Sequence, residues 1–471
     1  MKQPLARRTP AHRAELTERF AGGTESAAAP SWQADFRTPQ QRDRDRILYS
    51  AAFQRLAYVT QVTAPESGLT FHNRLSHSLK VAQVGRRNAE RLRALAKAKV
   101  ITGAAATLVR SVDPDAVEAA CLAHDLGHPP FGHIAEEVLQ ERAAHAQIHD
   151  RFEGNAQSFR IVTRLAQRPS ASGLNLTRQT LDGLLKYPWK HWNVDPLNKR
   201  HRKWGYYDED EEVFAWVRRH QPPEVRDALP PQSIEAAIME WADDLTYAVH
   251  DVEDFYRAGL VPLERLGEED GEEMGHFEKL LRRYDQEEPG VLGAPVDQIL
   301  AASRQLFPSP KMPTGPYRNT REDRRRVHRM TSDLITDYLS AFRVTDDPKT
   351  GEVVLKIDET VRKRVAALKA LVRVYVVRRP GLAVVQHGQK RVIGDLFDFY
   401  LDASAEEGGD RRLFPPGPRA LLDAGPDTLE RRVRIVIDLI AGLTEDSAIQ
   451  LHQRLVGGAA APTLDATAQM A

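Results

Sequence analysis

Apolar residues recur every three or four positions over most of the chain, the spacing of one face of an α-helix. The clearest case is residues 234–256, where Ile238, Ala242, Leu245, Val249 and Val252 share a face. Only residues 353–357, flanked by charged residues, carry a convincing strand pattern. The sequence therefore predicts an all-α protein with a minor short β-ribbon.

Changes of composition divide the chain into segments. The start is polar and rich in Ala, Gly and Arg, and it predicts a mobile arm. A central piece, acidic and then rich in Gly and Pro, predicts a variable insert between two helical regions. We expect an arm at 1–35, a helical core at 36–260, the insert at 261–320, a C-terminal helical region packing on the core at 321–456, and a disordered tail at 457–471.

Charge and hydropathy restrict the partners. The 471 residues include 66 Lys and Arg and 66 Asp and Glu, so net charge gives no argument for nucleic-acid or membrane binding. There is no apolar run of membrane-spanning length and no apolar signal core at the start. We expect a cytoplasmic protein with no membrane partner.

The densest chemistry lies at residues 119–136. His124 and Asp125 follow an apolar helical segment and offer a nitrogen and an oxygen ligand to a divalent metal ion. A glycine and two prolines then break the helix, which places His128 and His133 on a rigid turn. The alternative is a helix-turn-helix elbow whose histidines are ordinary core residues.

A new helical pattern begins near His133, so Glu136 lies one turn away on the same face. On the predicted helix at 234–256, Asp243, Tyr247 and Asp251 are spaced four residues apart beside the apolar stripe. Carboxylates there are costly to bury unless a cation or hydrogen-bond donors meet them.

A metal ion explains these carboxylates. Two imidazoles and two carboxylates from three helices suit a borderline-to-hard divalent ion with open positions for water and a phosphate oxygen. The candidate ligands are His77, His124, Asp125 and Asp243.

This ligand pattern resembles that of the HD-domain phosphohydrolases. The run His-Asp-Leu-Gly-His-Pro-Pro-Phe-Gly-His at 124–133 is similar to one branch, the deoxynucleoside triphosphate triphosphohydrolases or dGTPase-like proteins. Further similar stretches, in order, are 38–47, 53–56, 60–62, 73–85, 152–157, 184–189, 242–247 and 440–444. The resemblance implies the HD-domain helical phosphohydrolase fold, with the HD catalytic core at 36–260.

The resemblance also implies residue roles. His77, His124, Asp125 and Asp243 match the ligands of one divalent ion per site, Mn²⁺ or Mg²⁺ ahead of Fe²⁺, Co²⁺ or Ni²⁺. The matches to substrate-binding residues are Arg74, His128 and Tyr247 at the phosphates, Lys186 and Lys203 more loosely, Gln61 and Asp251 at the 3′-hydroxyl, and Val62 beside Gln61.

The implied reaction is attack of water on the α-phosphorus of a deoxynucleoside triphosphate (dNTP), which releases a deoxynucleoside and inorganic triphosphate. His133, oriented by Glu136, matches the residue that moves a proton, either from the water or to the leaving 5′-oxygen. The matches leave the preferred base open.

Two other functions stay open. One is another HD phosphohydrolase, such as a nucleotidase or phosphodiesterase, and the other is a regulatory protein that binds nucleotides or single-stranded DNA on an HD scaffold. The resemblance further implies a homo-oligomer, a hexamer or tetramer, with a possible nucleotide or single-stranded DNA activator. Basic clusters at 199–203 and 324–329 could serve such sites or be solvated surface.

Overall fold

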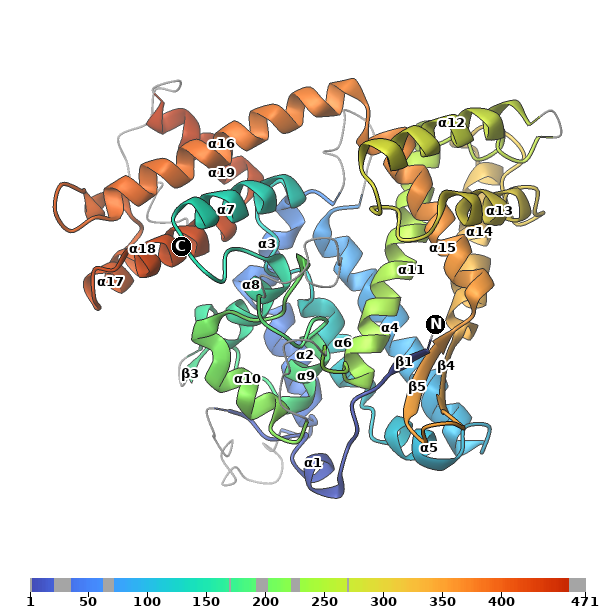
Figure 1. Ribbon diagram of the computed structural model, residues 1–471, viewed down its shortest axis with the longest axis horizontal. Helices are drawn as coiled ribbons and strands as arrows, with labels where there is room; N and C mark the ends of the chain where they lie inside the picture. The colour runs from blue at the N-terminus through green and yellow to red at the C-terminus, as the bar shows by residue number, and fades with distance from the viewer. Residues whose placement is uncertain are drawn as a thin grey trace.

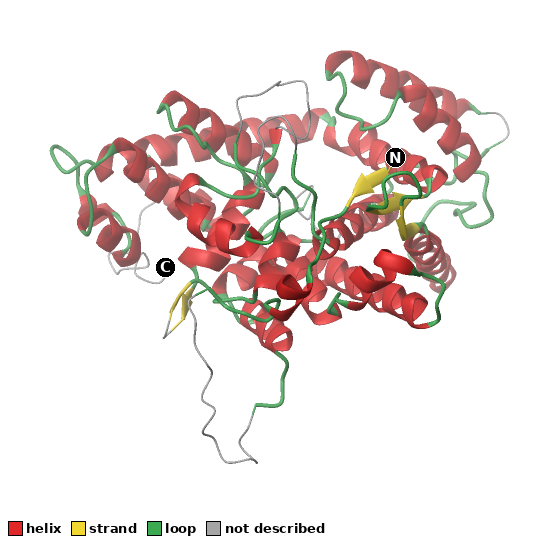
Figure 2. Cartoon of the chain, turned by 60° about the horizontal axis from the view of Figure 1, so that its bottom comes forward, coloured by secondary structure: helices red, strands yellow, loops and turns green. Residues whose placement is uncertain are grey.

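The computed structural model describes residues 2–20, 35–61, 72–168, 171–191, 202–221, 229–268 and 271–456. Helices make up most of these residues, and the few strands are short (Figures 1 and 2). The predicted all-α class with a minor β-ribbon is confirmed. None of the helices in the described ranges is long and apolar enough to cross a membrane.

Three helices form the centre of the molecule, and each begins after a residue with a capping side chain. Helix α4 (Arg74–Lys97) is capped by Asn73, α6 (Pro114–Ala123) by Asp113, and α11 (Ile234–Arg257) by Ser233. These helices contact one another, and α2 (Pro39–Leu48) and α9 (Arg178–Leu184) pack against them. This bundle brings three sequence-distant segments to one site.

The other elements surround this bundle (Figure 1). The α-helices are α1 (Pro10–Ala14), α3 (Ala51–Arg55), α5 (Gly103–Arg110), α7 (His133–His145), α8 (Gly154–Arg160), α10 (Glu211–Arg218), α12 (Glu272–Glu287), α13 (Val296–Leu306), α14 (Arg321–Ser340), α15 (Glu359–Val372), α16 (Pro380–Ser404), α17 (Pro416–Asp423), α18 (Leu429–Ala441) and α19 (Glu445–Leu455). The 3₁₀ and π turns are η2 (Leu56–Tyr58), η3 (Ile161–Leu165), η5 (Asp208–Asp210), η6 (Arg373–Val377) and η7 (Arg411–Leu413).

The predicted ribbon is one strand of a three-stranded antiparallel sheet. Strand β5 (Val353–Ile357) lies between β4 (Phe342–Asp346) and β1 (Lys2–Pro4). A second, two-stranded ribbon joins β2 (Gln167–Arg168) to β3 (Ala171–Ser172).

The expected mobile arm is wrong for residues 2–20. Strand β1 pairs with β5, and Leu5 and Ala6 after it are buried. Arg8 then donates to the buried carboxylate of Glu235 on α11, with 3.0 Å between Nη1 and Oε1. Residues 21–34 and the expected tail at 457–471 lie outside the described ranges.

The predicted insert at 261–320 packs closely on the core. Helices α12 and α13 bury Phe277, Leu281 and Ile299 completely, in the same apolar cluster as α11 and α15. Several of its acidic residues, such as Glu272 and Glu287, lie on the exposed face of α12.

The C-terminal helices form a second apolar cluster with α7. Phe397 of α16, Val436 of α18 and Leu139 of α7 are buried in it. Figure 1 shows α16 running above α7 toward α17 and α18. The helix that begins at the predicted catalytic residue His133 is therefore packed against the C-terminal region.

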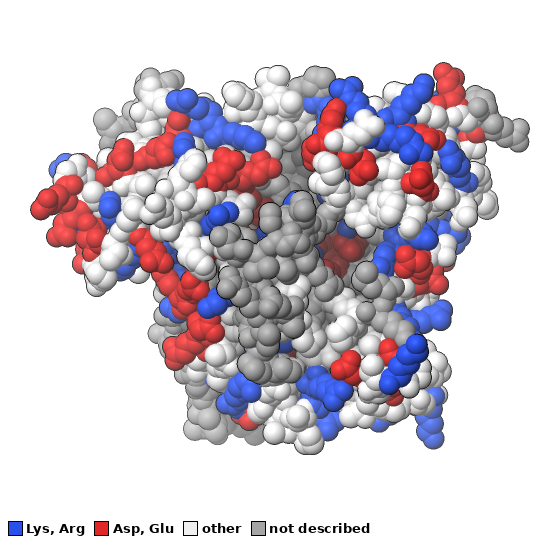
Figure 3. All heavy atoms as spheres, in the orientation of Figure 1, with Lys and Arg blue, Asp and Glu red and all other residues white. Residues whose placement is uncertain are grey.

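On the face seen in Figure 3, basic and acidic side chains are interspersed, in line with the balanced composition.

Candidate active site

The four predicted metal ligands meet where α4, α6 and α11 cross. Asp243 Oδ1 lies 3.2 Å from His77 Nε2 and 3.6 Å from His124 Nε2. Asp125 Oδ1 lies 3.4 Å from His124 Nε2. His77, His124 and Asp125 are each buried and offer ligand atoms within 4.8 Å of one another. Two nitrogens and one oxygen thus converge, and Asp243 Oδ1 lies beside both nitrogens.

The donor set fits a divalent metal ion. His124 Nδ1 lies 2.6 Å from the Cys121 carbonyl oxygen, and this contact turns Nε2 toward the other ligands. Nε2 is buried and has no hydrogen-bond partner within the described part of the chain. Burial lowers the pKa of His124, but Asp125 and Asp243 raise it above its ordinary value. A cation bound between these groups would satisfy both the buried nitrogen and the two carboxylates.

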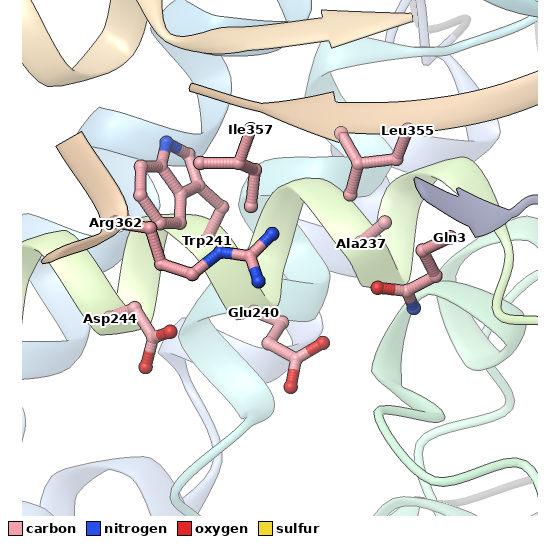
Figure 4. A pocket seen from close by; sticks show the side chains of 8 residues that line it. All are labelled: Gln3, Ala237, Glu240, Trp241, Asp244, Leu355, Ile357 and Arg362. Carbon is pink, nitrogen blue, oxygen red and sulfur yellow. The ribbon is translucent and has the colours of Figure 1, made fainter. Parts of the chain in front are cut away.

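The helical phase of α11 separates Asp243 from its neighbour. Asp244 forms an ion pair with Lys369 of α15 and lines a cavity of about 160 Å³ between α11 and β5. Figure 4 shows Asp244 and Glu240 in this cavity, with Arg362 reaching over them. Of the two adjacent aspartates, only Asp243 faces His77 and His124.

Two cations, the buried Arg74 and the partly buried Lys186, hold the ligand carboxylates. Lys186 Nζ lies 2.9 Å from Asp243 Oδ2, and Arg74 Nη1 lies 2.9 Å from Asp125 Oδ2. Burial lowers the pKa of Lys186, but Asp243 raises it well above its ordinary value. Burial raises the pKa of Asp243, but Lys186 and the two histidines hold it well below the usual range. Both groups are therefore charged at neutral pH.

The predicted proton-transfer pair sits at the start of α7. His133 Nδ1 lies 2.5 Å from Glu136 Oε2, and the His133 side chain is 69% exposed while Glu136 is buried. The Gly154 backbone N–H donates to Glu136 Oε1 at 3.1 Å. Burial raises the pKa of Glu136, but Lys203 and His133 hold it well below its ordinary value. An ionised carboxylate thus orients an accessible imidazole.

His128 and Lys203 connect this pair to the ligand cluster. His128 Nδ1 lies 3.1 Å from Asp125 Oδ1. Lys203 Nζ lies 2.9 Å from Glu153 Oε1 and 3.6 Å from Glu136 Oε2. Burial lowers the pKa of Lys203, but Glu136 and Glu153 together raise this pKa above its ordinary value.

The aromatic segment at 186–207 is partly packed. Trp189, Trp204 and Tyr207 are buried together in a small apolar cluster. These rings are not free to stack on a base. Lys199 and the two residues after it lie outside the described ranges.

Two of the predicted sugar-binding residues hold buried polar atoms. Asp251 Oδ2 and Gln61 Oε1 are both buried, and neither has a hydrogen-bond partner among the residues that the structure describes. Burial raises the pKa of Asp251 well above its ordinary value, and Asp254 and Asp243 add to the shift. Tyr247, one turn before Asp251, has Lys369 Nζ 5.5 Å from its ring centre. Val62 lies outside the described ranges.

Comparison with known proteins identifies the family. The chain is 38% identical over 437 residues to a deoxyguanosinetriphosphate triphosphohydrolase-like protein of Streptomyces coelicolor, covering 89% of this chain and 93% of that protein. This chain belongs to that family. A like-named protein of Corynebacterium glutamicum is 34% identical over 87% of this chain and 89% of its own length, and one of Shewanella sp. (strain ANA-3) is 30% identical over 93% and 96%.

Two family models match this dGTPase-like chain. The HD domain matches residues 74–248, from the start of α4 into α11, and thus contains all four predicted ligands. The phosphohydrolase-associated domain matches residues 355–454, from β5 to α19. The chain is a phosphohydrolase of the HD class.

Sequence reasoning assigned no role to Arg55, a buried residue that supports the site of this dGTPase-like protein. Its Nη2 donates to the carbonyl oxygens of Leu126 and His128, each at 2.8 Å, and its Nη1 donates to that of Leu443 at 3.1 Å. No spacing rule identifies such a contact, because its partners are carbonyl groups 71 or more residues away. The arginine fixes the turn that follows the His-Asp pair.

Proposed function

We propose that this protein hydrolyses deoxynucleoside triphosphates at the α-phosphorus, releasing a deoxynucleoside and inorganic triphosphate. The observation that supports this most directly is the cluster of three buried ligands and the partly buried Asp243, flanked by two fixed cations. His77, His124 and the two aspartates would hold the metal ion, and Lys186 and Arg74 lie within 3 Å of those aspartates. Such a site is complementary to a polyphosphate.

The divalent ion, when bound, polarises the α-phosphate and promotes attack by water. Side chains of the protein supply positive charges that can pair with the negatively charged triphosphate. Arg74, Lys186 and Lys203 are charged groups that can pair with non-bridging oxygens, and His128 beside Asp125 offers a further donor. A buried arrangement of this kind strengthens each electrostatic contact.

His133 moves the proton in this proposal. Its Nδ1 is held by the ionised Glu136, which leaves Nε2 available on an exposed side chain. Through Nε2 it either takes a proton from the attacking water or gives one to the leaving 5′-oxygen. Glu136 is a positioning residue that keeps the ring oriented.

The sugar would lie against Tyr247, with Asp251 and Gln61 at the 3′-hydroxyl. The two buried oxygens without partners are suited to pair with a hydroxyl group of the ligand. With its raised pKa, the Asp251 carboxyl is able to donate as well as accept a hydrogen bond. Stacking of Tyr247 close to C2′ would exclude ribonucleotides by a steric clash.

Product analysis tests the proposal. Each dNTP singly, and all four mixed, would be incubated with the protein and Mn²⁺ or Mg²⁺. The predicted products are a deoxynucleoside and intact triphosphate, and activity only in the mixture would indicate activation by a nucleotide. Release of orthophosphate or pyrophosphate would contradict the proposal.

Adjacent aspartates provide a matched control. Asp243→Asn is expected to reduce turnover by about 10³-fold or more, because it removes a ligand of the metal ion. Asp244→Asn removes the same charge one residue away, on the face that contacts Lys369, and is expected to stay within about threefold of wild type. A His124→Ala, Asp125→Ala double variant should be inactive. Equal loss in both asparagine variants would refute the assignment of Asp243.

The identity of the metal ion, the homo-oligomer, the activator and the cytoplasmic location stay predictions from the sequence, which leaves the preferred base open.

A further inference from the structure

One carboxylate from the last helix joins two parts of the candidate active site. Glu445, the first residue of α19, accepts a hydrogen bond from the Thr60 backbone N–H at 2.8 Å and one from the Phe131 backbone N–H at 3.2 Å, both at Oε1. Its Oε2 accepts from the Thr60 hydroxyl at 2.7 Å. The partners lie 385 and 314 residues away along the chain.

Each of these partners adjoins a residue of the proposed chemistry. Thr60 precedes Gln61, and it forms an isolated antiparallel bridge with Asn73, the cap of the helix that carries Arg74 and His77. The Arg74 backbone N–H also donates to the Val59 carbonyl at 3.1 Å. A shift of Thr60 would therefore move both the sugar contact and the start of α4.

Phe131 belongs to the turn that leads into His133. Phe131 and Gly132 have φ values of 65° and 58°, and a non-glycine residue adopts this left-handed region at an energetic cost. A methyl group on Gly132 would come within 2.7 Å of Arg74 Nη2, so the turn is also closely packed. The bond from the Phe131 N–H to Glu445 helps to hold this strained turn in place.

A second contact, from the junction between α18 and α19 (residues 443–445), supports the other end of the turn. Arg55 bridges the Leu443 carbonyl, between α18 and α19, to the carbonyls of Leu126 and His128. Residues 443–445 thus hold the segment from 126 to 131 at both ends, through Arg55 at one end and directly at Phe131 at the other. They belong to the phosphohydrolase-associated domain, which supplies none of the predicted ligands.

We propose that Glu445 is a positioning residue for the hydrolytic reaction, through which the phosphohydrolase-associated domain aligns the Thr60–Gln61 segment with the turn before His133. This inference rests on the proposed function. Glu445 touches neither metal nor substrate; its effect passes through Gln61 and His133.

Three substitutions separate hydrogen bonding from charge. In E445A all three contacts are lost. In E445Q the amide oxygen is able to accept from both backbone N–H groups while the amide NH₂ donates to Thr60 Oγ1, so the geometry is kept without the charge. D446A is the matched control, because Asp446 is the next residue in the first turn of α19 and is exposed. It removes the same favourable charge at the helix N-terminus.

The expected kinetic result is a fall in kcat of about 10- to 100-fold for E445A, the scale of a misplacement of about 1 Å, with a smaller change in KM. Because Gln61 is displaced, the preference for a dNTP over the matching 2′,3′-dideoxynucleotide should also fall. E445Q should restore kcat to within about threefold of wild type, the rescue expected when its hydrogen bonds are kept, and D446A should match wild type.

Wild-type kcat in E445A would overturn the proposal, and so would an E445Q variant as impaired as E445A. If E445A does not fold, E445D decides, because its shorter carboxylate cannot reach both Thr60 and Phe131. Wild-type kcat in E445D would then refute the inference.

Hydrogen exchange keeps this test independent of the proposed function. If the wild type releases no triphosphate from any dNTP, the proposed function fails, and the contact itself is judged by amide exchange. Faster exchange of the Thr60 and Phe131 amides in E445A but not in D446A would support the hydrogen bonds from these amides to Glu445. Unchanged exchange at both amides would exclude these hydrogen bonds.

Discussion

Gly85 allows the three ligand-bearing helices to approach one another, and its replacement gives a quantitative prediction. A methyl group at this position of α4 would lie 2.5 Å from Cys121 Sγ and 3.3 Å from Val117 Cγ1 on α6, and 3.6 Å from Ala242 Cβ on α11. Cys121 is completely buried. The first distance is shorter than any van der Waals contact, so the helices or the thiol must shift.

The magnitudes follow from opposing terms. Replacing glycine by alanine inside a helix stabilises it by about 1 kcal/mol, while overpacking costs about 1–3 kcal/mol. We expect Gly85→Ala to lower the free energy of unfolding by about 1 kcal/mol. Cys121→Ala removes one buried heavy atom and should cost about 1 kcal/mol. In the double variant the new methyl group fills the space of the lost sulfur, so the coupling should be favourable by about 1 kcal/mol or more.

Urea unfolding of the wild type and the three variants measures this coupling. Gly388→Ala is the matched control, because Gly388 lies within helix α16 with nothing within 4 Å of an added methyl group. It should be stabilising by about 0.5–1 kcal/mol. Additive effects of the Gly85 and Cys121 substitutions, within about 0.5 kcal/mol, would refute the proposed crossing geometry.

Three further substitutions test the site and its surroundings. Gly127→Ala should abolish activity and metal binding measured by calorimetry, because the methyl group would overlap backbone atoms of Gly154; retained binding would contradict this packing. Lys203→Met should raise KM about 10- to 100-fold in steady-state assays, the value of a lost charge-assisted hydrogen bond, and an unchanged KM would exclude it from phosphate binding. Burial lowers the pKa of His12 from 6.5 to about 4. As the pH drops between these two values, the unfolded state takes up a proton on His12 that the folded state does not. The free energy of unfolding should therefore fall over this pH range. His12→Gln should flatten this dependence in urea titrations at several pH values, and an unchanged slope would contradict a neutral buried His12.

Much of the fold was accessible from sequence because its signals are local. Asn73 and Asp113, residue types that favour helix N-termini, cap α4 and α6, and the apolar stripe from Ile234 predicted α11. The helical repeat also places Asp243 on the same face as Tyr247 and Asp251 and puts Asp244 on a different face. This distinction can be read from the spacing of the residues.

The features that were missed depend on contacts between distant segments. Strand β1 is ordered by pairing with β5 about 350 positions later, and residues 2–20 alone show only a polar composition. Glu445 follows a capping threonine and has the sequence context of an ordinary first-turn acid. Its role at Thr60 and Phe131 requires the tertiary structure.

The most direct test of the central claim is hydrolysis of a dNTP in water enriched in the heavy oxygen isotope, with mass spectrometry of both products. Attack at the α-phosphorus predicts one heavy oxygen atom in the released triphosphate and none in the deoxynucleoside. A label in the deoxynucleoside, or release of labelled orthophosphate or pyrophosphate, would contradict the proposed reaction.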